Sequence, residues 1–283
     1  MMTSPVGQAS NPWAIYDRMI AMIPDAITVT ACAVSQWTVV TASNGGCGIV
    51  FTSTEGPDVG AQPQLAVGME LREVASWVKS WNFVLASIGQ AALNCFFNTA
   101  ERLSLYPASA ANNSLSCFSR HLDALAGHSV TMIGHFKDAD RIQSRAERLT
   151  ILERQPRDAD LPDPACEYVL AESDWVYMTG ETLLNKTMPR LIALCRNPWD
   201  GSDPARITLV GPSVTFAPEV FLDAVAEFAG VIVTDPTAML AAVQVGGGHR
   251  ELKPHYTSFN VCFAETGLTP DPVDTYPEFV HHA

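Results

Sequence analysis

The first half of the chain opens with a pattern that is typical of an antiparallel sheet. Residues 27–52 are rich in Val, Ile and Thr, and turn residues interrupt them at Ser35-Gln36 and at Asn44-Gly45-Gly46. β-Forming runs separated by such turns predict a three-strand antiparallel meander. A helix-like stretch at 12–23 precedes the meander.

Two amphipathic helices are expected next. After a loop at 53–68 that contains Gly and Pro, apolar residues recur at i, i+3, i+4 and i+7 over 71–78 and again over 84–96. Asn82 is placed to cap the second of these helices. A short helix is expected at 115–125.

The second half alternates between short apolar runs and helical patterns. This order predicts a parallel sheet of Rossmann-like α/β topology with right-handed crossovers. The expected strands are 129–136, 150–156, 174–180, 206–212 and 230–236, with an extra strand at 256–263. Helices are expected around 142–149 and at 188–195, 218–228 and 236–245.

Composition narrows the class of protein. Hydrophobic residues make up 47% of the 283 residues and charged residues 17%, which is enough for a large core. The formal net charge of -13 argues against a nucleic-acid partner, because such binders cluster Lys and Arg. The first residues carry neither a basic nor an apolar segment, and no apolar run has the length of a membrane span. We therefore expect a cytoplasmic protein without a membrane partner.

The cysteines and histidines show no metal-binding spacing. The chain has 7 Cys, no two of them spaced C-x-x-C, and its 7 His include no H-x-x-x-H. An odd number of thiols without such pairs fits the reducing cytosol. From spacing alone we expect no stoichiometric structural zinc.

Candidate ligand-binding residues follow the expected strands, because ligands of an open parallel sheet bind beyond the carboxyl ends of its strands. These candidates are Gly134, His135, Glu153, Thr179, Gly180, Gly211, Pro212, Ser213 and Asp235. Glu153 follows Gly134 at about the 20-residue spacing of a ribose-binding acid, but the pattern G-x-G-x-x-G is missing. A solvated Glu at a strand end explains it equally well. We therefore expect no tight binding of NAD, NADP or FAD.

The stretch Gly211-Pro212-Ser213 ends a strand abruptly. Gly211 lets the backbone turn and a ligand approach, and Pro212 fixes the turn. Ser213 has three interpretations: a nucleophile, a wall of a binding site, or a turn residue. Its context, G-P-S-V-T, is not the G-x-S-x-G elbow of a catalytic serine, so a wall or a turn residue is favoured.

Three more polar residues complete the candidate site. Pro189 fits only the first turn of a helix, which makes Thr187 the expected N-cap and 180–187 an extended βα loop or short turn over the sheet edge. Asn185 and Thr187 would then lie beside a helix N-terminus, where anions bind, although ordinary capping also explains Thr187. Asn94 interrupts the apolar stretch GQAALNCFF; it is either a hydrogen-bonded core residue or a side chain that reaches a cleft between the two halves. We expect one cleft to be faced by Asn94, Glu153, Asn185, Thr187 and Ser213.

Six stretches resemble, in order, the bacterial and archaeal family of putative heavy-metal chelation proteins: GQAALNCFFN, MIGHF, TILERQPRDADLP, TGETLLNKT, LVGPSVTFAP and AGVIVTDP. The resemblance implies an α+β enolase-N-terminal-like domain, placed at 12–126, followed by a Rossmann-like α/β domain at 127–263 and a tail at 264–283. It implies a site in the cleft between the domains and, as ligand, a metal ion or a metal–chelate complex. Lys186 departs from the family, which often has a small residue there, and it could add charge to the site or crowd it.

Three functions stay open. The first is a cytosolic protein that binds, and in one version modifies, a small anionic or metal-chelating molecule in the interdomain cleft, with a role in heavy-metal chelation or metallophore handling. The second is an enzyme that uses a nucleotide or S-adenosylmethionine on the Rossmann-like half. The third is a non-catalytic partner in metal uptake. The sequence decides neither catalysis nor the formation of a homodimer.

Overall fold

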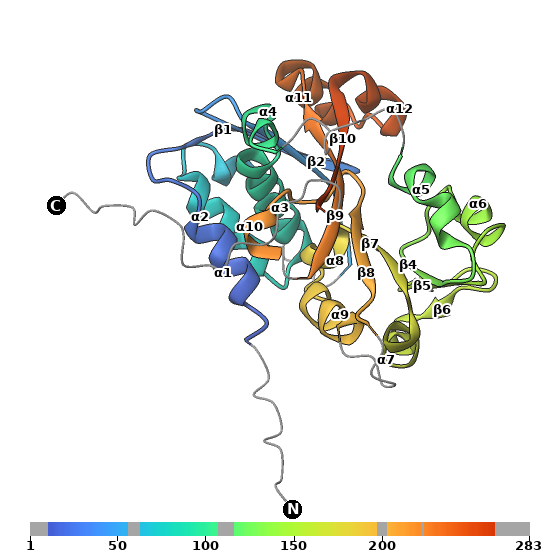
Figure 1. Cartoon of the computed structure of the whole chain (residues 1–283). Coiled ribbons are helices and arrows are strands. Elements are labelled where there is room, and N and C mark those ends of the chain that lie inside the picture. The colour runs from blue at the N-terminus through green and yellow to red at the C-terminus, as the bar shows by residue number, and fades with distance from the viewer. Residues whose placement is uncertain (1–10, 56–62, 107–115, 197–202, 222–223, 264–283) are drawn as a thin grey trace, which may run out of the picture.

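A computed structural model of the chain describes residues 11–55, 63–106, 116–196, 203–221 and 224–263. The expected tail at 264–283 and residues 56–62 of the loop expected at 53–68 lie outside these residues. The described residues form a small antiparallel sheet, a large mixed sheet and the helices that cover both (Figure 1). Within these residues, no helix is long and apolar enough to cross a membrane.

The predicted meander is confirmed. β1 (Val29–Val34), β2 (Trp37–Ala42) and β3 (Cys47–Phe51) pair in that order and are antiparallel throughout. The first four residues of β2 are all buried, because helices pack on both faces of this sheet. α3 (Phe83–Phe97) covers one face and α11 (Pro236–Gln244) covers the other. A β-rich run without apolar–polar alternation therefore reflects a strand that is buried on two sides.

The helices of the first half begin close to where the sequence predicts. Asn82 caps α3 as expected, since its Oδ1 accepts hydrogen bonds from the backbone N–H groups of Val84 (3.0 Å) and Leu85 (3.1 Å). The helix expected over 71–78 is α2 followed by a 3₁₀ turn, because its hydrogen-bonding pattern changes at Trp77. The bounds of the short elements are α1 (Ala14–Ala21), η1 (Pro63–Ala66), α2 (Leu71–Ser76), η2 (Trp77–Lys79) and α4 (Ala100–Ser104).

The second half forms a seven-stranded sheet in the order β10-β9-β8-β7-β4-β5-β6. The strands β4 to β9 run parallel, and β10 pairs antiparallel with β9. The chain moves from β4 to β5 and β6 and then returns to β7 on the other side of β4. The switch point of the sheet therefore lies between β4 and β7, where ligands of such sheets bind. The bounds are β4 (Ser129–Ile133), β5 (Arg148–Glu153), β6 (Leu161–Pro162), β7 (Trp175–Thr179), β8 (Arg206–Val210), β9 (Val225–Val233) and β10 (Tyr256–Cys262).

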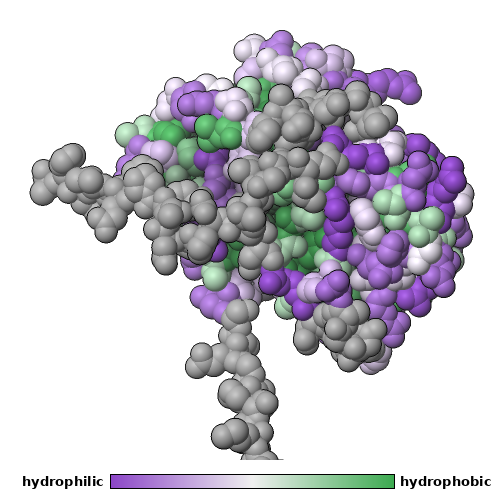
Figure 2. Space-filling model, viewed as in Figure 1, coloured by the Kyte–Doolittle hydropathy of each residue, from purple (hydrophilic) through white to green (hydrophobic). Residues whose placement is uncertain are grey.

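Helices cover both faces of this sheet. Met132, Tyr177 and Val210 point to one face, where they pack beneath α5 and α6, while Ile133, Met178 and Leu209 point to the core shared with the first half. The face of α5 and α6 is largely hydrophilic on its outside (Figure 2). The helices of this half are α5 (Cys117–Arg120), η3 (Leu122–Leu125), α6 (Ala139–Gln143), η4 (Asp163–Ala165), α7 (Cys166–Val169), η5 (Leu170–Glu172), α8 (Glu181–Leu184), α9 (Met188–Cys195), α10 (Pro218–Phe221), α11, α12 (His249–Leu252) and η6 (Lys253–His255).

Three local predictions are wrong. The helix expected at 218–228 ends at Phe221, and β9 begins at Val225. The run AVAEFAG fits both a helical and an alternating pattern, and pairing with β8 and β10 on its two sides decides for the strand. The helix expected at 115–125 is broken after Arg120 into α5 and η3, and the helix expected around 142–149 is α6, which ends at Gln143 before β5 begins at Arg148. The extended loop or short turn expected at 180–187 contains the one-turn helix α8.

Candidate functional site

A row of three polar side chains joins α3 to the seven-stranded sheet. Gln90, Asn94 and Asn98 are spaced by four residues and so share one face of the helix. Gln90 Nε2 donates hydrogen bonds to the carbonyl groups of Gly180 (2.9 Å) and Ser213 (2.6 Å). Asn98 bonds the backbone of the same loop a few residues further on. We call this row, with its backbone partners, the α3 seam.

Asn94 and Ser213 are both buried in the α3 seam. Asn94 Nδ2 donates to the carbonyl of Ile49 (3.1 Å), and its Oδ1 accepts from the hydroxyl of Thr215. Ser213 Oγ accepts from the backbone N–H of Phe51 (3.0 Å). Asn94 is therefore a hydrogen-bonded core residue in the structure, which is the first of its two interpretations. As ligand contacts, Asn94 and Ser213 stay predictions, and a ligand would have to replace these bonds.

Asn185 and Thr187 lie in the turn between α8 and α9. Asn185 Oδ1 accepts hydrogen bonds from the backbone N–H (3.1 Å) and the hydroxyl (2.6 Å) of Thr187. Thr187 stands at the N-cap position of α9, but its side chain caps no helix N–H. Lys186 points toward the first half of the chain, where its ammonium donates to the carbonyl of Ser80 and lies 4.8 Å from the ring centre of Phe83. Burial lowers the pKa of Lys186 to about 8.

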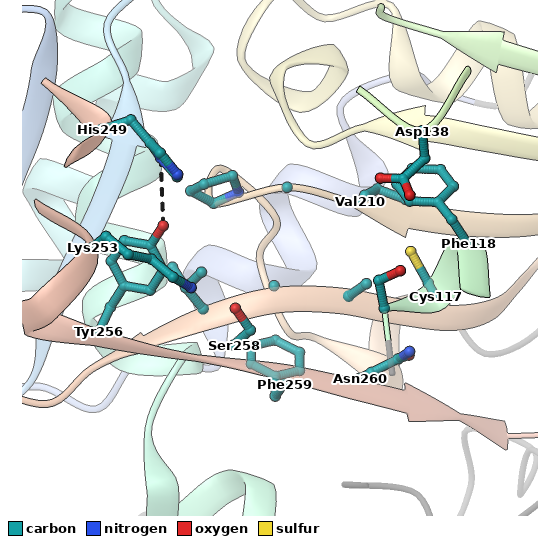
Figure 3. A pocket seen from close by; sticks show the side chains of 16 residues that line it. Cys117, Phe118, Asp138, Val210, His249, Lys253, Tyr256, Ser258, Phe259 and Asn260 are labelled. Carbon is teal, nitrogen blue, oxygen red and sulfur yellow. Dashed lines mark hydrogen bonds between the residues drawn. The ribbon is translucent and has the colours of Figure 1, made fainter. Parts of the chain in front are cut away.

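Gly211 and Pro212 line a cavity of about 470 Å³ that lies against β9 and β10 (Figure 3). Gly211 has a φ of 112°, a left-handed conformation that favours glycine. Ser213, which follows Pro212, points away from this cavity and into the α3 seam. Asp235 is the N-cap of α11, where its Oδ1 accepts from the backbone N–H of Ala238 (2.9 Å).

The other five predicted residues lie around the switch point. Gly134 follows β4 with a φ of 102°, and a Cβ at this position would be 3.3 Å from the side chain of Thr179, which ends β7. The backbone N–H of His135 donates to Glu153 Oε1 (2.8 Å) at the end of β5. Gly180 comes directly after Thr179 and is the N-cap residue of α8. The carboxyl ends of β4, β5 and β7 therefore bring these residues to one edge of the sheet.

Two acidic residues that were not predicted complete this edge. Glu181 lies in the first turn of α8, and Glu55 comes four residues after the end of β3. Burial, and then the charges of Glu153 and Glu55, raise the pKa of Glu181 to about 7. Glu55 Oε2 forms an ion pair with Arg154 Nε (3.0 Å). We call Glu55, Glu153 and Glu181 the carboxylate cluster.

The sequence held a signal for only one of these two residues. Glu181 follows Thr179-Gly180 directly, so the strand-end rule that selected Glu153 applies to it as well. Nothing local distinguishes Glu55, because it comes from the first half of the chain and approaches Arg154 only in the folded protein.

His135 is fixed at the border of this edge. Its Nδ1 lies 3.3 Å from Asp160 Oδ2, and the same carboxylate oxygen accepts the backbone N–H of Arg157 (3.2 Å). The Asp160 side chain is almost fully buried, whereas that of His135 is 40% exposed. A buried carboxylate therefore orients an imidazole that solvent can reach.

Comparison with known proteins places the chain in a family. The model of DUF364, described as "Putative heavy-metal chelation", matches residues 117–261, which is just over half of the chain. The chain belongs to the DUF364 family. The model of DUF4213, which has the same description, matches residues 16–97. These matches confirm the resemblance seen in the sequence.

Solved structures of the DUF364 family agree with the fold. A protein of unknown function from Desulfitobacterium hafniense is 30% identical, covers 89% of this chain and 98% of its own, and superposes with a TM-score of 0.75. A second family member, from Pyrococcus horikoshii, is 15% identical, covers 88% and 98% of the two chains, and has a TM-score of 0.71. No curated protein matches the chain. The predicted fold class, an α+β part followed by a Rossmann-like α/β part, is confirmed.

Proposed function

We propose that this protein binds a metal ion held by a small chelating molecule, and that the metal contacts the carboxylate cluster. The family description supports a metal ligand, and the position of the cluster at the switch point supports a ligand at this edge of the sheet. A bare anion would face Glu55, Glu153 and Glu181 together. The metal of a chelate is therefore the part of the ligand that fits.

The observation that carries this proposal is the raised pKa of Glu181. Burial is the main cause of this rise of the pKa to about 7, and the charges of Glu153 and Glu55 add to it. A divalent cation would supply positive charge and take the place of the proton. Perturbed groups of this kind concentrate at functional sites.

Neighbouring residues suit the organic part of such a ligand. Arg154 is 43% exposed beside Glu55 and could pair with a carboxylate of the chelator. Gly134, His135, Thr179 and Gly180 would form the walls. The remaining predicted contacts have protein partners or lie at the cavity of Gly211, and this proposal does not use them.

Titration with nickel nitrilotriacetate tests the proposal. At pH 7.5 calorimetry should find saturable binding to the full chain, and the Glu181→Gln variant should bind at least about tenfold more weakly because it lacks one carboxylate. Nickel alone and nitrilotriacetate alone show which part of the complex the protein recognises. Glu147→Gln is the matched control, since Glu147 is an exposed acid just before β5, away from the carboxyl ends of the strands.

Two results would contradict the proposal. One is the absence of saturable binding of the complex to the unmodified chain. The other is an equal loss of binding in the Glu181→Gln and Glu147→Gln variants, which would indicate a general effect of net charge.

A second function, proton transfer to or from the bound molecule, is favoured by the same Glu181. A carboxyl with a pKa of about 7 can both donate and accept a proton near neutral pH, as a general acid–base catalyst must. In this case Glu181→Gln would keep its affinity for the complex and lose conversion of the chelator, which mass spectrometry would detect.

A further inference from the structure

A separate set of side chains of the types that ligate metals lies under α5, entirely within residues 121–262. The imidazole of His121, the carboxylate of Glu227 and the thiol of Cys262 are buried and place their ligand atoms within 4.8 Å of one another. Glu227 on β9 and Cys262 on β10 are direct partners across the two antiparallel strands, so both side chains point to the same face. His121 follows α5, which covers that face. We call these three residues the α5 cluster.

Within the described part of the chain, the hydrogen bonds of the α5 cluster leave one carboxylate oxygen, Glu227 Oε1, without a hydrogen bond, although Arg120 Nε lies 4.0 Å from it. His121 Nε2 lies 2.9 Å from Glu227 Oε2, which also accepts from the hydroxyl of Thr208 (3.2 Å). Among the described residues, Glu227 Oε1 has no hydrogen-bond partner, although its side chain is completely buried. Arg206 Nη2 donates to Cys262 Sγ (2.9 Å). A buried carboxylate oxygen without a hydrogen bond is costly, and the Arg120 guanidinium at 4.0 Å does not supply one. A metal ion bound directly to this oxygen would satisfy it.

We propose that the α5 cluster binds one divalent transition-metal ion of borderline or soft character, such as zinc, cobalt or cadmium. Thiolate, imidazole and carboxylate together form the donor set of such ions, whereas magnesium and calcium prefer oxygen ligands alone. The site is distinct from the carboxylate cluster, which offers only oxygen, and it goes beyond the proposed function.

Two arginines flank the α5 cluster. Arg120 Nε lies 4.0 Å from Glu227 Oε1, and Arg206 Nη2 donates to Cys262 Sγ (2.9 Å). A metal ion bound to the three side chains would take the place of these contacts.

The cavity next to β9 and β10 reaches residues that neighbour the α5 cluster in sequence. Cys117, four residues before His121, and Asn260, two residues before Cys262, line the same end of this cavity (Figure 3). Burial and the charge of Glu227 both raise the pKa of the Cys117 thiol, which places this thiol near the cluster.

Sequence spacing alone predicted no structural zinc, and the fold explains why that argument does not cover this site. Positions 121, 227 and 262 are far apart in the chain and meet only through the pairing of β9 with β10 and the position of α5. The alternative role for the α5 cluster is a closed ion pair between His121 and Glu227. Metal binding distinguishes the two roles.

Cobalt is the sharpest probe, because a cobalt–thiolate bond adds a charge-transfer absorption in the near ultraviolet. We expect the full chain, stripped with a chelator and kept reduced, to take up one cobalt ion per chain with this absorption. Cys262→Ser should abolish the absorption. His121→Gln should weaken cobalt binding at least about tenfold, while its amide keeps a hydrogen bond to Glu227 and preserves the fold.

Controls separate this site from the other thiols and from the proposed function. Cys32→Ser removes a partly buried thiol on β1, and Glu181→Gln alters the carboxylate cluster; both should keep the absorption. Thermal midpoints report whether each variant is folded. The proposal is overturned if the unmodified chain shows no thiolate absorption, if the absorption persists in Cys262→Ser, or if folded His121→Gln binds cobalt as tightly as the unmodified chain.

Discussion

The α3 seam and the carboxylate cluster both lie where the carboxyl edge of the large sheet meets the first half of the chain, yet their electrostatics differ. In the seam, Gln90, Asn94 and Asn98 each bond groups of the opposing loop. In the cluster, burial and two neighbouring carboxylates hold the proton of Glu181 up to about pH 7. Buried polar residues at one boundary can thus serve packing in one place and hold a proton near neutral pH in another.

This difference separates polar residues that stabilise from those that could bind. An amide whose donor and acceptor are both used inside the protein must lose hydrogen bonds before it can contact a ligand. A carboxyl that resists ionisation gains stability when a cation arrives. Substitutions in the α3 seam and in the carboxylate cluster test this difference, from the largest expected effect to the smallest.

The largest effect is expected at Gly180, where the seam is tightest. A Cβ at this position would lie 2.4 Å from the backbone nitrogen of Val214, so Gly180→Ala should lower the free energy of unfolding by more than about 3 kcal/mol. Gly211→Ala is the comparison, since its Cβ would meet no atom within 4 Å and only its positive φ costs about 1 kcal/mol. Urea unfolding of both variants measures the difference. Equal losses would show that Gly180 is not packed this closely.

Asn94→Ala should lower the free energy of unfolding by about 3 kcal/mol, because it leaves the carbonyl of Ile49 and the hydroxyl of Thr215 without partners in the core. Asn185→Ala, which removes a half-buried turn contact, should cost less than about 1 kcal/mol. Thermal unfolding compares them. If Asn94→Ala leaves the midpoint unchanged, the seam is not a structural contact and Asn94 is free to serve a ligand.

Glu181→Gln should act in the opposite direction and stabilise the protein at high pH. The pKa of Glu181 is raised from 4.5 to about 7 in the folded chain, so the folded state holds this proton more tightly than the unfolded state. The contribution of protonated Glu181 to the free energy of unfolding is therefore complete below pH 4.5, and it is lost as the pH rises through about 7. The variant should therefore gain about 2 kcal/mol over the unmodified chain at pH 8 and little at pH 4.5. Urea unfolding at pH 4.5 and pH 8 measures the free energy of unfolding of both proteins. If the variant differs from the unmodified chain by the same amount at the two pH values, the pKa of Glu181 is not raised.

The smallest effect is expected at the border of the cluster. Glu55→Gln removes the charge that contributes least to the raised pKa of Glu181, together with one surface ion pair to Arg154. The free energy of unfolding should change by less than about 0.5 kcal/mol. In an NMR titration the pKa of Glu181 should fall, and by less than it falls in Glu153→Gln. If the pKa of Glu181 falls further in Glu55→Gln than in Glu153→Gln, Glu55 and not Glu153 is the stronger of the two charges.

Much of the fold could be predicted from local patterns. The β-branched runs of β2 and β8 and the Asn82 cap are visible in the sequence because one dominant pattern decides each of them. The start of β9 was not predictable in this way, since AVAEFAG fits two periods and only pairing with β8 and β10 chooses between them.

The site was predictable only where it depends on strand ends. That rule found Gly134, His135, Glu153, Thr179 and Gly180 and could have found Glu181. It could not supply Glu55, which comes from the first half of the chain. Asn94 stood out as a polar residue in an apolar helix, but its place in a row with Gln90 and Asn98 indicates packing, which a single position does not show.

The most direct test of the proposed function is the affinity for nickel nitrilotriacetate measured by calorimetry from pH 6 to pH 8 in the unmodified chain and in Glu181→Gln. If the metal takes the place of the Glu181 proton, the affinity of the unmodified chain should rise as the pH approaches about 7 and then level off. Proton release, measured in buffers of different ionisation enthalpy, should fall over the same range, and Glu181→Gln should lack both changes. An affinity of the unmodified chain that is independent of pH, or the same pH dependence in the variant, would contradict binding at the carboxylate cluster.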